Sequence, residues 1–214
     1  MITVMNAKKH KLKIEKVQDY STRESIIEIS SSTFFKYGIH KVSMNDIAEK
    51  CGISKKTIYN YYESKHQLVE AILNYNIDEF EEHIKSIQEK SANANKELVL
   101  LFEYLIELYK EILPIFINDL KKSSINIYIE RSKFLLYSFL LNNYERGLNE
   151  QIYKERDSIK NDIQVVVRII QMLFSERNNE QSTKDCADIF FIREMLISYL
   201  SSRNVTQYIS NESG

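Results

Sequence analysis

The chain is poor in the residues that interrupt regular structure. Its 214 residues include one Pro, four Gly, two Cys and no Trp. Pro and Gly delimit the turns of all-β and α/β proteins, so their scarcity argues against both classes. Ile, Leu, Glu and Lys are abundant instead, and we predict an all-α fold. A chain of this length can bury a sizeable core without disulfides to support it.

The two cysteines, Cys51 and Cys186, lie far apart in stretches predicted to form apolar helices. We interpret them as small buried hydrophobic residues rather than as a disulfide or a metal site. No apolar run reaches the ~20 residues of a membrane span. The first residues also lack the apolar core of a signal peptide. We therefore expect a cytoplasmic protein that does not enter a membrane.

Motifs of common enzyme classes are missing from the sequence. It has no Gly-rich phosphate loop, no HExxH and no paired-Cys metal motif, and its four histidines, at positions 10, 40, 66 and 83, are scattered. Each of these motifs supplies a nucleotide or metal site that the corresponding chemistry requires. We expect no enzymatic activity, no catalytic residues, no metal and no cofactor.

Charge is unevenly distributed along the chain. Residues 1–66 hold 12 Lys or Arg against 7 Asp or Glu, whereas the remainder holds 17 against 23, so the two parts carry +5 and −6. A basic N-terminal third joined to an acidic remainder is expected when only the first part meets a polyanion.

The most informative segment is residues 43–65, SMNDIAEKCGISKKTIYNYYESK. Ala48 is small enough for a second helix to cross closely, and Gly52, four residues later, can adopt the left-handed conformation that ends a helix. Ile53, Ile58 and Tyr61 then form the inward side of the next helix. This spacing predicts a helix-turn-helix.

Three serines mark the expected helix starts in this region. Each is followed three residues later by a side chain suited to an N-terminal cap: Ser43 by Asp46, Ser54 by Thr57 and Ser64 by Gln67, the last a capping-box pairing. A preceding helix is predicted over residues 22–37, ending at Gly38. The expected core of this three-helix unit is Ile27, Phe34, Ile47, Ala48, Ile53 and Ile58.

Four regions follow from these patterns. Residues 1–20 form a Lys-rich arm that lies along DNA or is a solvated tail, residues 21–66 a DNA-binding domain, residues 67–205 a larger helical domain, and residues 206–214 a tail. Two strongly apolar helices, about 158–177 and 183–201, are predicted to form a four-helix bundle with a second copy. The alternative is that both helices only cover the core of their own chain.

Residues 37–73, YGIHKVSMNDIAEKCGISKKTIYNYYESKHQLVEAIL, resemble the helix-turn-helix of the TetR family of bacterial regulators. The shared features are a Gly near the end of the first helix, a hydroxyl cap, Asp-Ile-Ala, Gly-Ile-Ser, Thr-x-Tyr and Ser-Lys. The match covers about a fifth of the chain. It implies a DNA-binding domain joined to a divergent ligand-binding domain, and a homodimer.

The resemblance also implies roles for individual residues. Phosphate and backbone contacts fall to Thr57, Tyr59, Tyr61 and Lys65, and base contacts to Asn45, Lys55 and Lys56, while Ser43 opens the helix whose N-terminus approaches the strand. Lys56 replaces a small residue common in the family, so its contact is either a base edge or a phosphate.

Helical rotation from an inward Ile58 independently turns Lys56 and Asn60 outward. The same periodicity buries Tyr61, whereas the resemblance places its hydroxyl on a phosphate. A buried ring with a solvated tip satisfies both expectations.

We hypothesise a repressor that binds a roughly palindromic DNA operator as a homodimer, with recognition helices about 34 Å apart, and is released by a small apolar or aromatic effector. The expected lining of its pocket is aromatic: Phe102, Tyr109, Phe116, Tyr128, Phe134, Tyr137 and Phe139. The alternative for each of these residues is an ordinary core position. The alternative function is a helical protein-interaction scaffold that has lost DNA binding.

Overall fold

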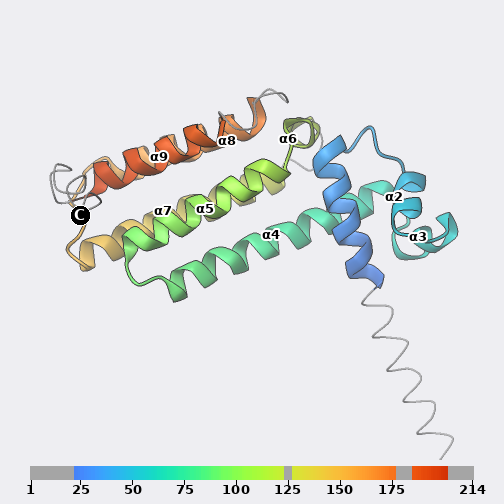
Figure 1. Cartoon of the computed structure of the whole chain (residues 1–214), viewed down its shortest axis with the longest axis horizontal. Helices are drawn as coiled ribbons and strands as arrows, with labels where there is room; N and C mark the ends of the chain where they lie inside the picture. The colour runs from blue at the N-terminus through green and yellow to red at the C-terminus, as the bar shows by residue number, and fades with distance from the viewer. Residues whose placement is uncertain (1–21, 123–126, 177–184, 202–214) are drawn as a thin grey trace, which may run out of the picture. The chain divides into compact units, whose positions relative to one another are not determined.

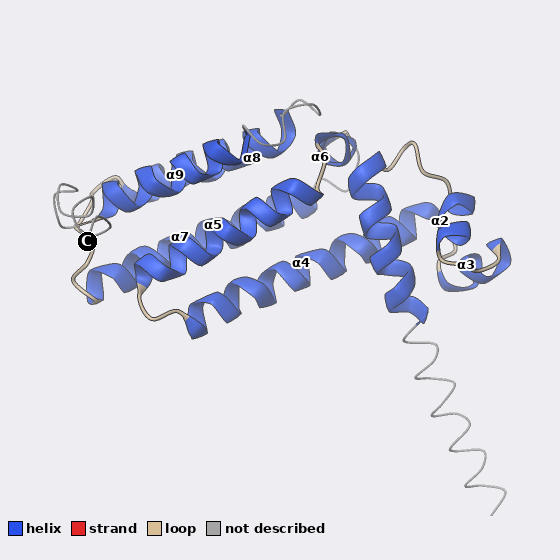
Figure 2. Ribbon diagram, viewed as in Figure 1, coloured by secondary structure: helices blue, strands red, loops and turns tan. Residues whose placement is uncertain are grey.

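The computed structural model describes residues 22–122, 127–176 and 185–201, and the regular elements in these ranges are all helices (Figures 1 and 2). The all-α prediction is confirmed. Among the described residues, no helix combines the length and the apolar character that a bilayer crossing requires. The chain forms two compact units, and the boundary between them falls between Tyr75 and Asn76.

The first unit contains a helix over residues 22–37, α2 (Met44–Lys50), α3 (Lys55–Tyr61) and the start of α4 (Lys65–Lys90). Of the six predicted core residues, Phe34, Ile47, Ala48 and Ile58 are buried. The other two, Ile27 and Ile53, are half-buried.

Ile26 is buried in place of Ile27. It lies on the same stripe of the first helix as the buried Ser30, Thr33 and Phe34, because positions four, seven and eight apart share one face.

The first unit extends to Tyr75, beyond the boundary at residue 66 that the sequence predicted. The reason lies in the first turns of α4. Leu68, Val69 and Ile72 are all buried there, and they belong to the part of α4 that falls within the first unit. One uninterrupted helix therefore contributes residues to both units.

The second unit is built around α5 (Ala94–Glu111), which packs against both α7 (Ile127–Asn149) and α9 (Asp185–Leu200). It also contains α6 (Pro114–Lys121) and α8 (Ile159–Glu176), which pack together. Buried positions follow one another along α5 at Leu98, Leu101, Phe102, Leu105 and Tyr109, as expected for the central helix of a bundle. Pro114 starts α6, where its missing N–H costs no helical hydrogen bond.

A charged junction ties the end of α4 to α5 and α7. The guanidinium of Arg146 on α7 donates to Glu97 of α5 at 2.8 Å and to Glu150 at 2.7 Å. It also donates to the carbonyl of Gln88 in the last turn of α4 at 3.3 Å and to that of Ser91, just after α4, at 2.8 Å. Glu97 is only 2% exposed, so its charge depends on this partner. Burial raises the pKa of Glu97, and the Arg146 guanidinium opposes that shift.

The last turn of α7 requires a residue without a side chain at position 147. The ring of Tyr153 packs directly over Gly147, and a Cβ at position 147 would overlap that ring. Tyr153 forms a single antiparallel bridge with Ser201, and the N–H of Lys154 donates to the carbonyl of Leu200 at 2.9 Å. The end of α9 is thereby attached to the α7–α8 connection.

Candidate nucleic-acid interface

The turn between α2 and α3 is fixed by its backbone. Gly52 has a φ of +65°, a conformation that strains residues with a side chain. Its N–H donates to the carbonyl of Glu49, and the N–H of Ile53 donates to that of Ala48, both at 3.0 Å. This pair of bonds is a Schellman motif, which ends α2 and directs the chain into α3. The predicted role of Gly52 is confirmed.

The N-terminus of α2 carries the predicted cap in its full, reciprocal form. The Ser43 Oγ accepts from the N–H of Asp46 at 3.2 Å, and the Asp46 carboxylate accepts from the N–H of Ser43 at 2.8 Å. The backbone and side-chain donors of Ser43 hold the pKa of Asp46 below its ordinary value of 3.8. The start of α2 is therefore rigid.

The other two serines also cap their helices. The Ser54 Oγ accepts from the N–H of Thr57 at 3.0 Å, and the two hydroxyls pair at 2.8 Å. The Ser64 Oγ accepts from the N–H of Gln67 at 3.1 Å, but the Gln67 amide reaches the N–H of Glu63 rather than that of Ser64. The capping box predicted at α4 is thus displaced by one residue, although the helix begins where expected.

The predicted DNA-contacting residues divide into exposed and half-buried sets. The exposed residues are Ser43, Asn45, Lys55, Lys56, Tyr59 and Asn60. The half-buried residues are Thr57, Tyr61 and Lys65. Helix α3, KKTIYNY, contains no carboxylate, and its single buried residue is Ile58. Its outer surface therefore presents cationic, amide and phenol groups.

Two of the lysines lie over aromatic rings. The Lys55 Nζ lies 5.9 Å from the centre of the Tyr59 ring, along the exposed side of α3. The Lys65 Nζ lies 5.9 Å from the centre of the Phe34 ring. Both distances lie near the outer limit at which a cation is attracted to the face of an aromatic ring.

Arg23 of the first helix contacts two aromatic rings at the end of α3, which the sequence analysis did not predict. Its guanidinium lies 5.6 Å from the ring centre of Tyr61 and 5.9 Å from that of Tyr62. Tyr62 is 3% exposed and burial raises the pKa of its hydroxyl, whereas Tyr61 is half-buried. Tyr62 therefore occupies the core position that periodicity assigned to Tyr61. No short-range pattern links Arg23 to residues almost forty positions away.

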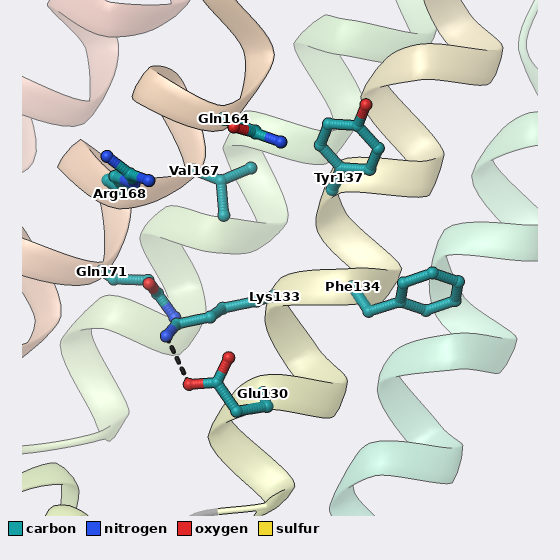
Figure 3. A pocket seen from close by; sticks show the side chains of 8 residues that line it. All are labelled: Glu130, Lys133, Phe134, Tyr137, Gln164, Val167, Arg168 and Gln171. Carbon is teal, nitrogen blue, oxygen red and sulfur yellow. Dashed lines mark hydrogen bonds and ion pairs between the residues drawn. The ribbon is translucent and has the colours of Figure 1, made fainter. Parts of the chain in front are cut away.

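The second unit carries a hollow between α7 and α8 (Figure 3). Its volume is about 340 Å³, and its lining comprises Glu130, Lys133, Phe134, Tyr137, Gln164, Val167, Arg168 and Gln171. Of the aromatic residues predicted to line a pocket, Phe134 and Tyr137 lie here. Four others, Phe102, Tyr109, Phe116 and Phe139, are buried core residues. Tyr128 is half-buried and lies outside this lining.

Helices α8 and α9 expose large apolar side chains. On α8 these are Val165 and Met172, which are 52% and 53% exposed. On α9 they include Phe191, 68% exposed, and Met195, 44% exposed. The residues of each pair are four or seven apart and so share one helix face. Each helix therefore presents an apolar strip to solvent in the single chain.

The remaining expectations concern a metal site, the two cysteines and the N-terminal arm. Within the described ranges, no three His, Cys, Asp or Glu side chains are grouped as a metal site requires. Cys51 is a half-buried free thiol whose pKa is raised by burial. The side chain of Cys186 and the Lys-rich arm over residues 1–20 lie outside the described residues.

Comparison with known proteins identifies the same segment. Residues 26–72 match the model of the bacterial regulatory proteins of the tetR family. Over 97 residues the chain is 28% identical to the HTH-type transcriptional regulator TtgR of Pseudomonas putida. That alignment covers 45% of each protein, so the chain matches about half the length of this relative.

Solved structures extend the likeness to most of the fold. A TetR-family transcriptional regulator from Agrobacterium tumefaciens superposes with a TM-score of 0.69 at 13% identity, covering 86% of this chain and 99% of the other. The regulator FadR of Bacillus subtilis, solved in complex with stearoyl-CoA, gives 0.54 at 19% identity over 83% and 98%. An N-terminal helix-turn-helix domain followed by a larger helical domain is therefore confirmed as the architecture.

Proposed function

Because the chain belongs to the TetR family of bacterial regulatory proteins through its N-terminal domain, we propose that it is a cytoplasmic repressor that binds a palindromic DNA operator as a homodimer. The family consists of DNA-binding transcriptional regulators rather than enzymes. The finer statements, that it represses, that its operator is palindromic and that a small molecule releases it, form the proposal.

The observation that carries this proposal is the outer surface of α3. Lys56 and Asn60 are exposed on a helix without carboxylates, and the rigid turn at Gly52 sets where that helix begins. Lys donates to guanine O6 and N7, and Asn pairs with adenine N6 and N7. Thr57 and Tyr59 flank them with hydroxyls suited to phosphates.

The apolar strips of α8 and α9 support the homodimer. Val165 and Met172 on one helix and Phe191 and Met195 on the other are too exposed to serve the core of their own chain. Exposed apolar surface of this kind marks an interface between proteins. A two-fold dimer contains two copies of α3, as a palindromic operator with two half-sites about 34 Å apart requires.

A ligand in the second unit is the proposed signal. The similar FadR of Bacillus subtilis was solved with stearoyl-CoA, which supports a ligand-binding role for this domain. A ligand changes operator affinity only by binding one conformation of the dimer more tightly than another. The apolar or aromatic effector expected from the sequence finds Phe134 and Tyr137 in the α7–α8 hollow.

Selection of bound fragments from a random DNA pool tests the proposal with the full chain. We expect an enriched palindrome whose half-sites are centred about one helical turn apart. Lys56→Ala should relax the preference at one position in each half-site if Lys56 contacts a base, or weaken all sequences equally if it contacts a phosphate. Lys41→Ala, an exposed lysine outside the predicted contacts, is the matched control.

A salt titration separates DNA binding from the alternative of a scaffold that has lost it. Lysine–phosphate contacts release counterions, so affinity for the selected duplex should fall steeply and linearly on a double-logarithmic plot. A protein that enriches no sequence and binds no duplex at low ionic strength is not a repressor, and the scaffold is then the better description.

A further inference from the structure

We propose that the hollow between α7 and α8 binds a small molecule with a flat apolar body and a single anionic oxygen group, held by Arg168. This deepens, and rests on, the proposal that the second unit binds an effector. The sequence predicted only an apolar or aromatic effector, whereas the charge of this hollow specifies a head group as well.

The size of the hollow suits a small organic ligand. Its volume of about 340 Å³ falls at the lower end of the range for ligand pockets. Its walls come from two adjacent packed helices, with Glu130, Lys133, Phe134 and Tyr137 from α7 and the remaining four residues from α8 (Figure 3). A site built on helices is more rigid than one built on loops.

The charges in the hollow leave one cation available. The Lys133 ammonium is paired with the Glu130 carboxylate on the same helix. Arg168, on the opposite wall, is exposed and makes no ion pair or hydrogen bond with any other residue that the structure describes. The hollow therefore carries a net charge of +1, located on a guanidinium. A planar guanidinium binds a carboxylate or another oxyanion through two parallel hydrogen bonds.

The remaining lining specifies the body of the ligand. Phe134 is 68% exposed, and the half-buried Tyr137 lies one turn further along α7. Val167 of α8 lies on the same side of α7 as Tyr137, whereas the ring of Phe134 points away from α8, and Gln164 and Gln171 add amide groups from α8 (Figure 3). A flat apolar body can lie against the Tyr137 ring and Val167 while its anionic group reaches the guanidinium.

The hollow is distinct from the apolar strip proposed for dimerisation. At about 100° per residue, Gln164, Arg168 and Gln171 share one side of α8, and Val165 and Met172 lie roughly a quarter of a turn away. A ligand bound beside Arg168 leaves that strip uncovered.

Helix α7 also connects the hollow to α4. Arg131, next to Glu130, donates to Asp78 and Glu81 of α4 at 3.2 Å each. The wall of the hollow and α4 are therefore linked by exposed ion pairs.

Two fluorescent probes with one ring system test the head group. The anionic probe is 8-anilinonaphthalene-1-sulfonate, and N-phenyl-1-naphthylamine is its counterpart without the sulfonate. We expect Arg168→Gln to lower the affinity for the anionic probe by roughly tenfold or more. Its affinity for the neutral probe should change by no more than about twofold. Lys160→Gln, an exposed cation near the start of α8 and outside the hollow, is the matched control.

A second pair of variants locates the apolar part. Tyr137→Ala should weaken the binding of both probes, whereas Phe191→Ala, which removes an exposed aromatic ring of α9, should weaken the binding of neither. Displacement of the anionic probe by 1-naphthoate and by 1-naphthyl phosphate then distinguishes a carboxylate head from a phosphate head.

The proposal is overturned if Arg168→Gln and Lys160→Gln have equal effects, or if Phe191→Ala removes probe binding while Tyr137→Ala does not. All these measurements use the full chain without DNA. A failure here therefore leaves operator binding intact, and a failure of operator binding leaves the probe result standing.

Discussion

Lys55 and Lys56 occupy the first turn of α3, where the helix dipole disfavours positive charge. That turn contains no acidic residue, although Asp and Glu are the residues that stabilise a helix start. The helix dipole therefore stabilises neither charge in the free protein. The arrangement becomes favourable if a polyanion lies against α3, as we propose.

Lys56→Glu should separate these two effects. We expect the free energy of unfolding of the free protein to rise by about 0.3–1 kcal/mol, because the new charge suits the dipole. Affinity for the selected operator should fall by at least about tenfold, since a cation near phosphates is replaced by an anion. Urea denaturation and fluorescence anisotropy measure the two quantities. Lys41→Glu, outside α3, should change neither the free energy of unfolding nor the operator affinity. A lower free energy of unfolding in Lys56→Glu would contradict the expected effect of the helix dipole.

The capping pair at Ser43 predicts a specific pH dependence. Hydrogen bonds from Ser43 lower the pKa of Asp46 in the folded state, so the ionised carboxylate stabilises the fold above its ordinary pKa of 3.8. That contribution should be lost as the pH falls through and below 3.8. A side-chain NMR titration should place Asp46 below 3.8 and show an upward shift in Ser43→Ala. An unshifted Asp46 in the parent protein would show that the cap is not formed in solution.

At the scale of elements, the junction around Arg146 differs in kind from the surface ion pairs. Glu97 is 2% exposed, so removing its partner leaves a buried charge uncompensated, whereas Arg131 and its partners on α4 are all well exposed. Buried pairs are costly to break, and exposed pairs contribute little. Arg146 is therefore the residue whose ion pairs and hydrogen bonds hold the end of α4 against α5 and α7.

Arg146→Met should lower the free energy of unfolding by about 3 kcal/mol, measured by urea denaturation. The double variant Arg146→Met, Glu97→Met should recover much of that loss, because it removes the orphaned charge. Arg131→Gln is the exposed control and should cost at most about 1 kcal/mol. Equal losses of unfolding free energy in Arg146→Met and Arg131→Gln would show that the junction is not buried in solution.

Much of the helix-turn-helix could be predicted from the sequence because its determinants are local. The caps at Ser43 and Ser54 and the turn at Gly52 each depend on residues within a few positions of one another. The predictions were wrong where the burial of a residue depends on packing between distant segments. Ile26 rather than Ile27 faces the core because of the helices it meets, and Tyr62 rather than Tyr61 is buried.

The second unit was harder to predict for the same reason. Its aromatic residues have helical spacing whether they fill a core or line a pocket, and only the central position of α5 separates Phe102 and Tyr109 from Phe134. The Arg146 junction joins residues about fifty positions apart, and no spacing rule reports it. The charge of the hollow depends on Arg168 and Glu130, which come from different helices.

At the scale of the whole molecule, DNA affinity and self-association are expected to be one property. A two-fold assembly presents two copies of α3, and the free energy of both contacts is gained only while the dimer persists. Substitutions on α9 should therefore change operator binding without touching a DNA contact.

Phe191→Asp should convert the dimer to a monomer and weaken operator binding by about a hundredfold or more, because it places a charge in the proposed apolar interface. Sedimentation equilibrium and fluorescence anisotropy measure the two effects. Phe134→Asp, an equally exposed phenylalanine on α7, should leave the association state unchanged. A parent protein that is monomeric at micromolar concentrations would contradict the interface.

The turn at Gly52 has a consequence for how such a protein diverges. The Schellman bonds and serine caps hold α3 through its backbone and through Ile58, so substitutions at positions 55, 56 and 60 on its solvent side should change stability only a little. If α3 reads DNA as proposed, gene duplicates can drift at those three positions and acquire new DNA targets while their scaffold stays intact. The same separation makes the chain suitable for laboratory retargeting, in which a library randomised there should consist mostly of folded molecules.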